Sequence, residues 1–327
     1  MTIDFSQTIP KDGEYTILVG SFYDKSESLS PINWEVLDII GTLKRRNYKI
    51  VLLSLQIDDA IIGQVIVSPF LRQRARKLGI SIYDHLSPDE ICKIKALLSS
   101  NAGFDDQIPL HPRDAFTQID DCVYINPVAL VYQFEGLSKE NKPTWHRLLG
   151  KRKIRESYFA EGGRTIVLEK MILASNIIRT KTQHDYKTFC SRKVYFLDLI
   201  DLVTSKETKA TEEFREHIDY FVNGFDTPQG AILVVNKDFY EKNKEVFEKI
   251  KKEQKAEIVF VTEKEKVFFP TGFVSLPNGK ILLTPDVPKT IKKIEELVDE
   301  TVITTQRPIP HLLDKEYSLR CFTNILF

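Results

Sequence analysis

The sequence predicts an α/β chain that is built from about five strand–helix–strand modules. Three observations predict this class. Strand and helix patterns alternate along most of the chain, several strands are continuously apolar as strands covered on both faces are, and similar modules return without sequence identity between them. The chain has 327 residues, 42% of them hydrophobic, which is enough apolar side chain for a core and excludes wholesale disorder.

The first module lies near the N-terminus. Tyr15–Gly20 is a short apolar run typical of a strand, and Lys49–Leu55 is a second one. Between them, Asn33–Arg46 has apolar residues every three or four positions, which predicts a helix with one buried face. Asn47 is expected to end this helix.

The segment 56–108 departs from the alternation and is predicted to be a helical insertion within the first module. Inside it, Ser87 can cap a helix, Pro88 suits the first helical position, and Glu90 can reach back to the cap amide. We expect residues 1–327 to form a single domain that carries this insertion.

The strand–helix–strand order returns further along the chain. Ala231–Asn236 and Glu257–Thr262 are predicted strands with a helix between them. Near the C-terminus, Asn278-Gly279 between two apolar runs predicts a hairpin, and Pro288 opens a helix. Two more strand-led units begin at Asp120–Asn126 and at Arg164–Leu173.

Charge and composition argue against several functions. The 46 basic side chains are balanced by 46 acidic ones, so the chain lacks the cationic surplus of a nucleic-acid binder. The longest apolar runs, such as Ile50–Leu55, are shorter than the roughly 20 residues that span a bilayer. The N-terminus has no signal-peptide pattern. The cysteines lie too far apart for a CxxC pair or a zinc knuckle, at Cys92, Cys122, Cys190 and Cys321.

From these exclusions we expect a cytoplasmic protein with no metal, no cofactor, no nucleic-acid partner and no membrane contact. The sequence leaves a homo-oligomer open.

Four short segments carry residue types suited to chemistry. They are Pro112-Arg113-Asp114-Ala115-Phe116, Glu161-Gly162-Gly163, His217-Ile218-Asp219, and Cys321 near the C-terminus. On a strand, His217 and Asp219 would project to the same face, because side chains two positions apart share one side. Taken singly, each segment has an ordinary structural explanation, such as a polar strand face, a glycine turn or a small buried thiol.

In this order, the four segments resemble the signature of the guanidino-group-modifying, or pentein, superfamily. That superfamily contains arginine deiminases, dimethylarginine dimethylaminohydrolases, agmatine and peptidyl-arginine deiminases, and amidinotransferases. The resemblance covers Arg113–Cys321 well and Tyr15–Leu55 more loosely. It implies a propeller of five ββαβ modules around a pseudo-fivefold axis, in agreement with the modules counted above. The helical insertion in the first module resembles the arginine deiminases.

The resemblance also implies a role for each residue. Asp114 and Asp219 would hold the planar guanidinium of the substrate, since carboxylates offer paired acceptors to its N–H donors. Cys321 would attack the guanidine carbon, because a thiolate is a strong nucleophile. His217 would give a proton to the leaving amine and later take one from water, and Glu161 would orient His217.

One further residue bears on the substrate. Arg179, in Ile178-Arg179-Thr180, would grip a substrate carboxylate, as an Arg near this place does in arginine deiminases and dimethylarginine hydrolases. The expected activity is hydrolysis of the C–N bond of an arginine-type guanidine through an amidino-cysteine intermediate. An amidinotransferase using the same intermediate and a non-catalytic pentein that binds a guanidino compound or a partner are the alternatives.

Departures from the superfamily pattern leave the substrate open. Arg164 stands where many relatives have Asp after the two glycines, and the Gly-rich loop that precedes the Cys in arginine deiminases is absent. The form Pro112-Arg113-Asp114 is common among amidinotransferases, but those enzymes usually lack the Glu161-Gly162-Gly163 motif, which favours a hydrolase. Arginine, a methylarginine, agmatine and peptidyl arginine all stay open as substrates.

Overall fold

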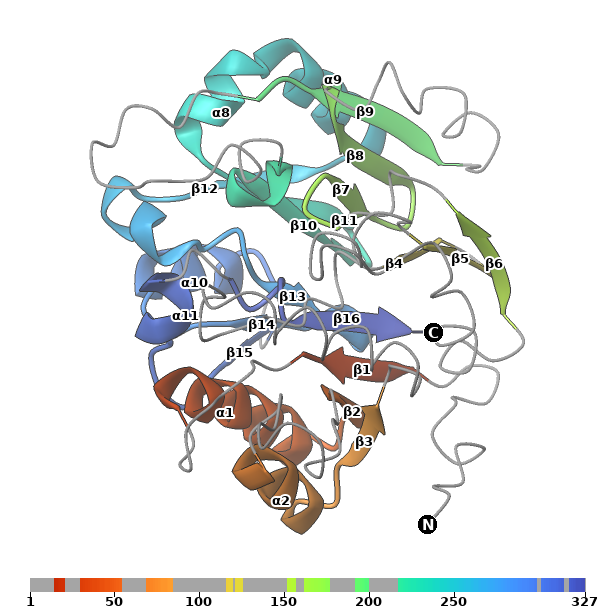
Figure 1. Cartoon of the computed structure of the whole chain (residues 1–327). Coiled ribbons are helices and arrows are strands. Elements are labelled where there is room, and N and C mark those ends of the chain that lie inside the picture. The colour runs from red at the N-terminus through yellow and green to blue at the C-terminus, as the bar shows by residue number, and fades with distance from the viewer. Residues whose placement is uncertain are drawn as a thin grey trace, which may run out of the picture. The chain divides into compact units, whose positions relative to one another are not determined.

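The computed structural model describes eleven stretches of the chain, namely residues 15–20, 30–54, 69–84, 116–119, 121–125, 152–156, 162–176, 192–199, 217–298, 301–314 and 318–326. These residues fall into two compact units. Their helices and strands are labelled in Figure 1. Unit 1 is Met1–Glu156 together with Phe322–Phe327, and unit 2 is Ser157–Cys321. The expected single domain over 1–327 stays a prediction.

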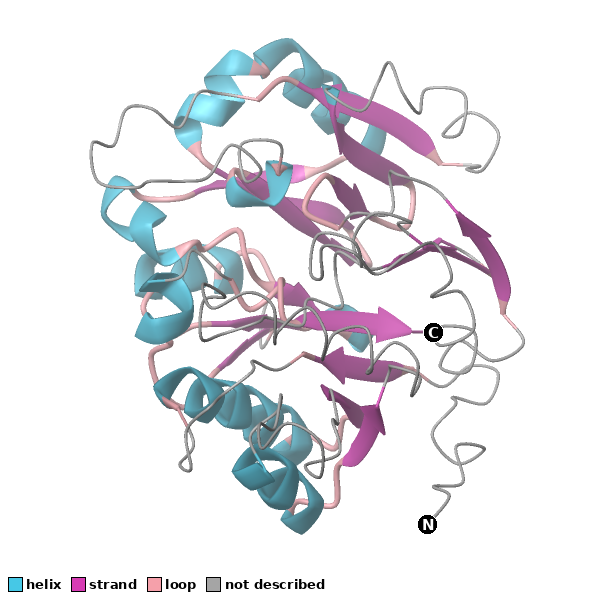
Figure 2. Cartoon of the chain, in the orientation of Figure 1, coloured by secondary structure: helices cyan, strands magenta, loops and turns pink. Residues whose placement is uncertain are grey.

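Unit 1 contains two of the sheets (Figure 2). The first has the strand order β16-β1-β2-β3, in which β1 pairs antiparallel with β16 and parallel with β2. The second has the order β4-β5-β6. The strands of this unit are β1 (Thr16–Val19), β2 (Ile50–Ser54), β3 (Ser81–Asp84), β4 (Phe116–Ile119), β5 (Cys122–Ile125), β6 (Lys153–Glu156) and β16 (Thr323–Leu326), and its helices are α1 (Pro31–Arg45) and α2 (Pro69–Lys77).

Helix α1 forms where the apolar periodicity predicts it. Ser30 caps it by accepting a hydrogen bond from the amide of Asn33 at 3.4 Å, and Pro31 occupies the first turn. The chain leaves the helix through Asn47, whose φ of 62° is the left-handed conformation that Asn tolerates. The predicted strand, helix and strand of the first module are confirmed as β1, α1 and β2.

The predicted helical insertion at 56–108 needs a correction. The residues described within it form α2 and then the strand β3, which pairs parallel with β2. The centre of β3 is Ile82-Tyr83, and β-branched and aromatic side chains of this kind favour a strand. At least part of the segment therefore extends the first sheet. The predicted helix start at Ser87 lies outside the described residues.

Unit 2 contains three sheets of three strands each, with the orders β7-β8-β9, β10-β11-β12 and β13-β14-β15. The strands are β7 (Thr165–Val167), β8 (Met171–Ser175), β9 (Lys193–Leu197), β10 (Val222–Thr227), β11 (Gly230–Val235), β12 (Glu257–Phe260), β13 (Val274–Ser275), β14 (Ile281–Leu283) and β15 (Val302–Thr304). The α-helices are α8 (Lys237–Lys242), α9 (Lys244–Gln254), α10 (Pro288–Glu295) and α11 (Pro310–Asp314), and the 3₁₀ turns are η6 (Ile218–Tyr220), η7 (Glu263–Phe268) and η8 (Pro277–Gly279).

One pairing pattern recurs in all five sheets of the described residues. In each sheet, one strand pairs antiparallel with one neighbour and parallel with its other neighbour, as β11 does with β10 and β12. In the other sheets the pairs are β1 with β16 and β2, β5 with β4 and β6, β8 with β7 and β9, and β14 with β13 and β15. Where the crossover between the parallel strands is described, a helix makes it, because parallel neighbours need a long connection. The α/β class is confirmed, and closure of the modules into a propeller stays a prediction.

Strand β11 shows why its sequence is apolar without alternation. Leu233 and Val235 belong to one core with Phe239 of α8, whereas Ile232 and Val234 belong to a second core on the opposite face. All of them are buried, so both faces of the strand are covered, as in a parallel α/β sheet. The first of these cores also includes Ile218, the residue between His217 and Asp219. No helix among the described residues is both long and apolar enough to cross a bilayer.

Candidate active site

The structure describes three of the six predicted site residues, and all three lie in unit 2. They are His217, Asp219 and Cys321. Asp114, Glu161 and Arg179 lie outside the described residues, so their roles stay predictions.

The segment that carries His217 and Asp219 is a 3₁₀ turn and not a strand. His217 precedes η6 with an extended backbone (φ −90°, ψ 118°), and Ile218 and Asp219 form the start of the turn. The amide of Asp219 donates to the carbonyl of Gly163 at 3.2 Å, and strand β10 begins only at Val222. The prediction that His217 and Asp219 lie on a strand is therefore wrong, because Asp219 belongs to a 3₁₀ turn and His217 directly precedes that turn.

The imidazole of His217 lies directly against the backbone of Gly163. A Cβ on Gly163 would come within 2.1 Å of Nδ1, which no real side chain could occupy. The ring of Tyr220 stacks near the imidazole, with centroids 6.2 Å apart and planes at 25°. His217 is buried, at 8% exposure. A glycine loop and an aromatic ring thus fix the orientation of the candidate acid and base.

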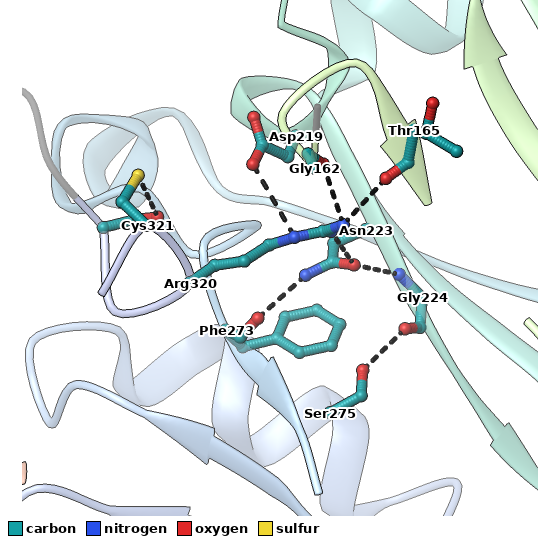
Figure 3. Close-up of polar contacts among 10 residues, drawn as sticks. Gly162, Thr165, Asp219, Asn223, Gly224, Phe273, Ser275, Arg320 and Cys321 are labelled. Atoms are coloured by element: carbon teal, nitrogen blue, oxygen red, sulfur yellow. Dashed lines mark hydrogen bonds and ion pairs between the residues drawn. The ribbon is translucent and has the colours of Figure 1, made fainter. Parts of the chain in front are cut away.

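Asp219 is also buried, at 6% exposure, and it pairs with Arg320, the residue that precedes Cys321. Arg320 places Nε 3.7 Å from Asp219 Oδ2. Figure 3 shows this guanidinium between Asp219 and Asn223, with the carbonyl groups of Gly162 and Thr165 at its far end. The buried carboxylate of Asp219 therefore faces a buried cation.

Cys321 closes a tight turn, and its thiol is half-buried. Its amide donates to the carbonyl of Ser318 at 3.1 Å, and the Ser318 hydroxyl lies 3.5 Å from Sγ. The turn packs closely on Gly272, because a Cβ there would lie 2.1 Å from the Cβ of Ser318. The amide of Arg320 also donates to the carbonyl of Gly272 at 3.0 Å. The thiol is therefore held on a rigid turn and not on a free terminus.

Sequence reasoning missed three residues that shape this site. Arg320, Asn223 and Ser318 are each isolated polar residues in the sequence, with no spacing that points to a partner. Arg320 stands next to Cys321, and this adjacency is the one signal in the sequence that draws attention to it. Only the folded chain shows its acceptors, of which Gly162 lies 158 positions away and Asn223 lies 97.

The three described candidate residues cover three chemical functions. A thiol can act as nucleophile, an imidazole can move protons, and a buried carboxylate can hold a cationic substrate. Among the described residues, no group of three His, Cys, Asp or Glu side chains is arranged to hold a metal ion.

Comparison with known proteins gives the fold. No protein-family model and no curated protein sequence matches the chain. Solved structures with a similar fold include an agmatine deiminase from C. jejuni, at 13% identity over 98% of this chain and 95% of the other, with a TM-score of 0.57. The amidinotransferase SxtG from Microseira wollei matches at 12% identity over 94% and 93%, with a TM-score of 0.56. A dimethylarginine dimethylaminohydrolase bound to S-methyl-L-thiocitrulline matches at 11% identity over 95% and 99%, with a TM-score of 0.54.

These structures cover nearly the whole chain and nearly their own full lengths. Their protein classes are those named by the motif resemblance. The likeness therefore shows that the chain has the fold of the guanidino-group-modifying structures, which the motifs predicted.

Proposed function

Starting from a chain with the pentein fold, we propose that it hydrolyses the C–N bond of an arginine-type guanidine through a covalent intermediate on Cys321. One observation carries the proposal. The segments that hold Cys321, His217 and Asp219 are bound to one another in unit 2, through Arg320 and the Gly162-Gly163 loop, although they are distant in sequence. A thiol, a fixed imidazole and an ionised carboxylate are what guanidine hydrolysis requires.

The first half of the reaction forms the intermediate. Asp219, together with Asp114, holds the substrate guanidinium by charged hydrogen bonds. The thiolate of Cys321 attacks the guanidine carbon and forms a C–S bond. His217 gives its proton to the departing nitrogen, the C–N bond breaks, and ammonia or an amine leaves.

The second half regenerates the enzyme. A water molecule attacks the carbon of the amidino-cysteine, and neutral His217 takes the proton from that water. The C–S bond then breaks, the Cys321 thiolate is restored, and the product is a ureido compound. Glu161 supports His217 in both steps by orienting the imidazole and favouring its charged form.

The test is to incubate the full chain with arginine, methylated arginines and agmatine, and to measure ureido product and released amine. We expect turnover of at least one of them and a covalent adduct of Cys321 in the mass spectrum. Cys321→Ser should abolish both while the fold stays intact, because an alcohol stays protonated near neutral pH. Cys122→Ala, which removes a buried thiol of unit 1, is the matched control and should keep full activity.

Two outcomes would replace this proposal. The form Pro112-Arg113-Asp114 favours an amidinotransferase, in which an acceptor amine attacks the intermediate in place of water. Product that appears only when an amine acceptor is added would support that reaction. Binding of a guanidino compound without adduct or product would support a non-catalytic pentein, for which Arg164 beside the glycine loop is the sequence argument.

A further inference from the structure

Arg320 is a buried arginine that the proposed chemistry does not use. It is 5% exposed and comes directly before Cys321 in the chain. Its Nη1 donates to Asn223 Oδ1 at 2.6 Å, and its Nη2 donates to the carbonyl groups of Gly162 at 3.1 Å and Thr165 at 3.0 Å. With the ion pair from Nε to Asp219 at 3.7 Å, each nitrogen of the guanidinium faces an acceptor (Figure 3).

The surroundings of this guanidinium are specific to arginine. A buried charge is costly unless it is paired and hydrogen-bonded, and Arg320 satisfies both conditions. The planar fork of arginine can bond acceptors in several directions at once, which a lysine ammonium of similar charge cannot copy. The acceptor Asn223 is itself fixed, because its Nδ2 donates to the Phe273 carbonyl at 2.9 Å and its Oδ1 accepts from the Gly224 amide at 2.9 Å.

The contacts of Arg320 join the separate motifs of the site. Arg320 donates to Gly162, which belongs to the glycine loop that contacts His217. It pairs with Asp219, the carboxylate proposed to hold the substrate, and it directly precedes Cys321 in the chain. The backbone bonds of these segments run to different places. The Asp219 amide is bound to the glycine loop, whereas the Arg320 amide is bound to Gly272. The side chain of Arg320 therefore connects the Cys321 turn to the glycine loop and to Asp219.

We propose that Arg320 is a positioning residue that holds the Cys321 turn in register with the Gly162-Gly163 loop and keeps the Asp219 carboxylate aimed at the substrate. This inference rests on the proposed function. The arginine also offsets the charge of Asp219, so that a substrate cation is recognised by the fit of its N–H donors to the carboxylate and not by a large local negative charge.

The first test does not depend on turnover. Hydrogen exchange of the full-length Arg320→Lys variant should increase in residues 162–165 and 217–221 as well as in 318–321. Arg192→Lys is the matched control, since Arg192 Nε also donates to a backbone carbonyl of unit 2, that of Glu169 at 2.8 Å, away from these segments. Increased exchange confined to 318–321, or spread evenly over the chain, would overturn the proposal.

The second test is kinetic. Misplacement of Asp219 should raise KM for the guanidine, and a shifted Cys321 turn should lower kcat, so that kcat/KM falls by about tenfold or more in Arg320→Lys. Unchanged kcat and KM in that variant would show that Arg320 has only a structural role. A wild-type protein without turnover would refute the proposed function, while the exchange result would still decide whether Arg320 holds the segments together.

A variant that fails to fold would not end the experiment. Asn223→Ser removes one acceptor of Arg320 and leaves the buried ion pair in place. It should raise exchange in the same three segments to a smaller extent, and exchange equal to wild type in residues 217–221 would count against the proposal.

Discussion

The imidazole of His217 rests on the Cα of Gly163, with no space for a side chain between them. A Cβ placed on Gly163 would stand 2.1 Å from Nδ1, 2.5 Å from Cγ and 2.6 Å from Cε1 of the ring. Gly163, the second glycine of the Glu161-Gly162-Gly163 motif, is therefore a packing surface for the His217 imidazole as well as a turn residue.

Gly163→Ala should therefore disable the proposed reaction by displacing His217. Because general acid–base catalysis contributes roughly 10²–10⁴ to a rate, we expect kcat to fall by about a hundredfold or more. The measurement is turnover of the best guanidine together with thermal unfolding. Gly41→Ala, on helix α1, is the control: its Cβ would lie 3.4 Å from Arg45 Nη1, and it should leave the activity unchanged. Wild-type kcat in Gly163→Ala would contradict the role given to this contact.

The Ser318 hydroxyl lies 3.5 Å from Cys321 Sγ and can donate to the thiolate. Removing a hydrogen bond to the charged form disfavours that form. We expect Ser318→Ala to move the pH midpoint of Cys321 alkylation by iodoacetamide upward by about half a pH unit to one unit. Ser275→Ala is the control, because the Ser275 hydroxyl donates to the Gly224 carbonyl and not to a thiol. A downward shift would show that the hydroxyl does not serve as donor.

The parts of the fold that the sequence predicts well are those with local signals. Helix α1 has its apolar periodicity and its Asn47 stop within one short segment, and strand β11 is a continuous apolar run. The segment around His217 has no such signal. Its polar-apolar-polar order is equally suited to a strand and to a 3₁₀ turn, and a long-range bond from Asp219 to Gly163 decides between them.

In the candidate site, too, local signals can be read from the sequence and long-range contacts cannot. The motif residues can be recognised by their types and order, and three of them fall in the described part of unit 2. Arg320 could not be assigned from the sequence, because its partners are two backbone carbonyls and two side chains far along the chain. Backbone carbonyls leave no trace in a residue pattern, since every residue has one.

Helix α10 is capped by a carboxylate from another segment. Val287 precedes the helix and offers no side-chain acceptor, while buried Glu265 accepts from the amides of Lys289 at 2.7 Å and Thr290 at 3.1 Å. Glu265→Gln loses the charge at a helix N-terminus and sets an amide N–H₂ against these donors. The free energy of unfolding should fall by about 2–3 kcal/mol, measured by urea denaturation.

The control for this prediction lies on the same 3₁₀ turn. Glu263 is exposed and pairs with Lys266 at the surface, at 2.8 Å. Glu263→Gln should change the free energy of unfolding by less than about 1 kcal/mol, because exposed ion pairs contribute little. Equal losses in the two variants would mean that capping by Glu265 is not the cause.

Burial raises the pKa of Asp226 above its ordinary value of 3.8, and the neighbouring Glu169 amide, which donates to Oδ2 at 2.8 Å, offsets this only in part. The folded protein therefore binds this proton more tightly than the unfolded chain does. Stability contributed by the group is present below the ordinary pKa and is lost as the pH rises through the raised one.

Asp226→Asn keeps an oxygen to accept from the Glu169 amide and removes the titration. The free energy of unfolding of the variant relative to wild type should be most favourable at neutral pH and should decline as the pH falls toward the ordinary pKa of 3.8. Denaturant titrations at several pH values would measure it. A difference that is constant with pH would show that ionisation of Asp226 is not what separates the two proteins.

The substrate class depends on Arg179, which lies outside the described residues. If this residue pairs with a substrate carboxylate, Arg179→Ala should raise KM for arginine more than it lowers kcat, because the contact is remote from the reacting carbon. A buried charged hydrogen bond contributes roughly 2–4 kcal/mol, so kcat/KM for arginine should fall by about thirtyfold to a thousandfold. Agmatine has no carboxylate for Arg179 to hold and serves as the internal control, so its turnover should hardly change. Equal loss for arginine and agmatine, or no loss for either, would place Arg179 away from the substrate carboxylate and would favour a decarboxylated or peptide-bound guanidine.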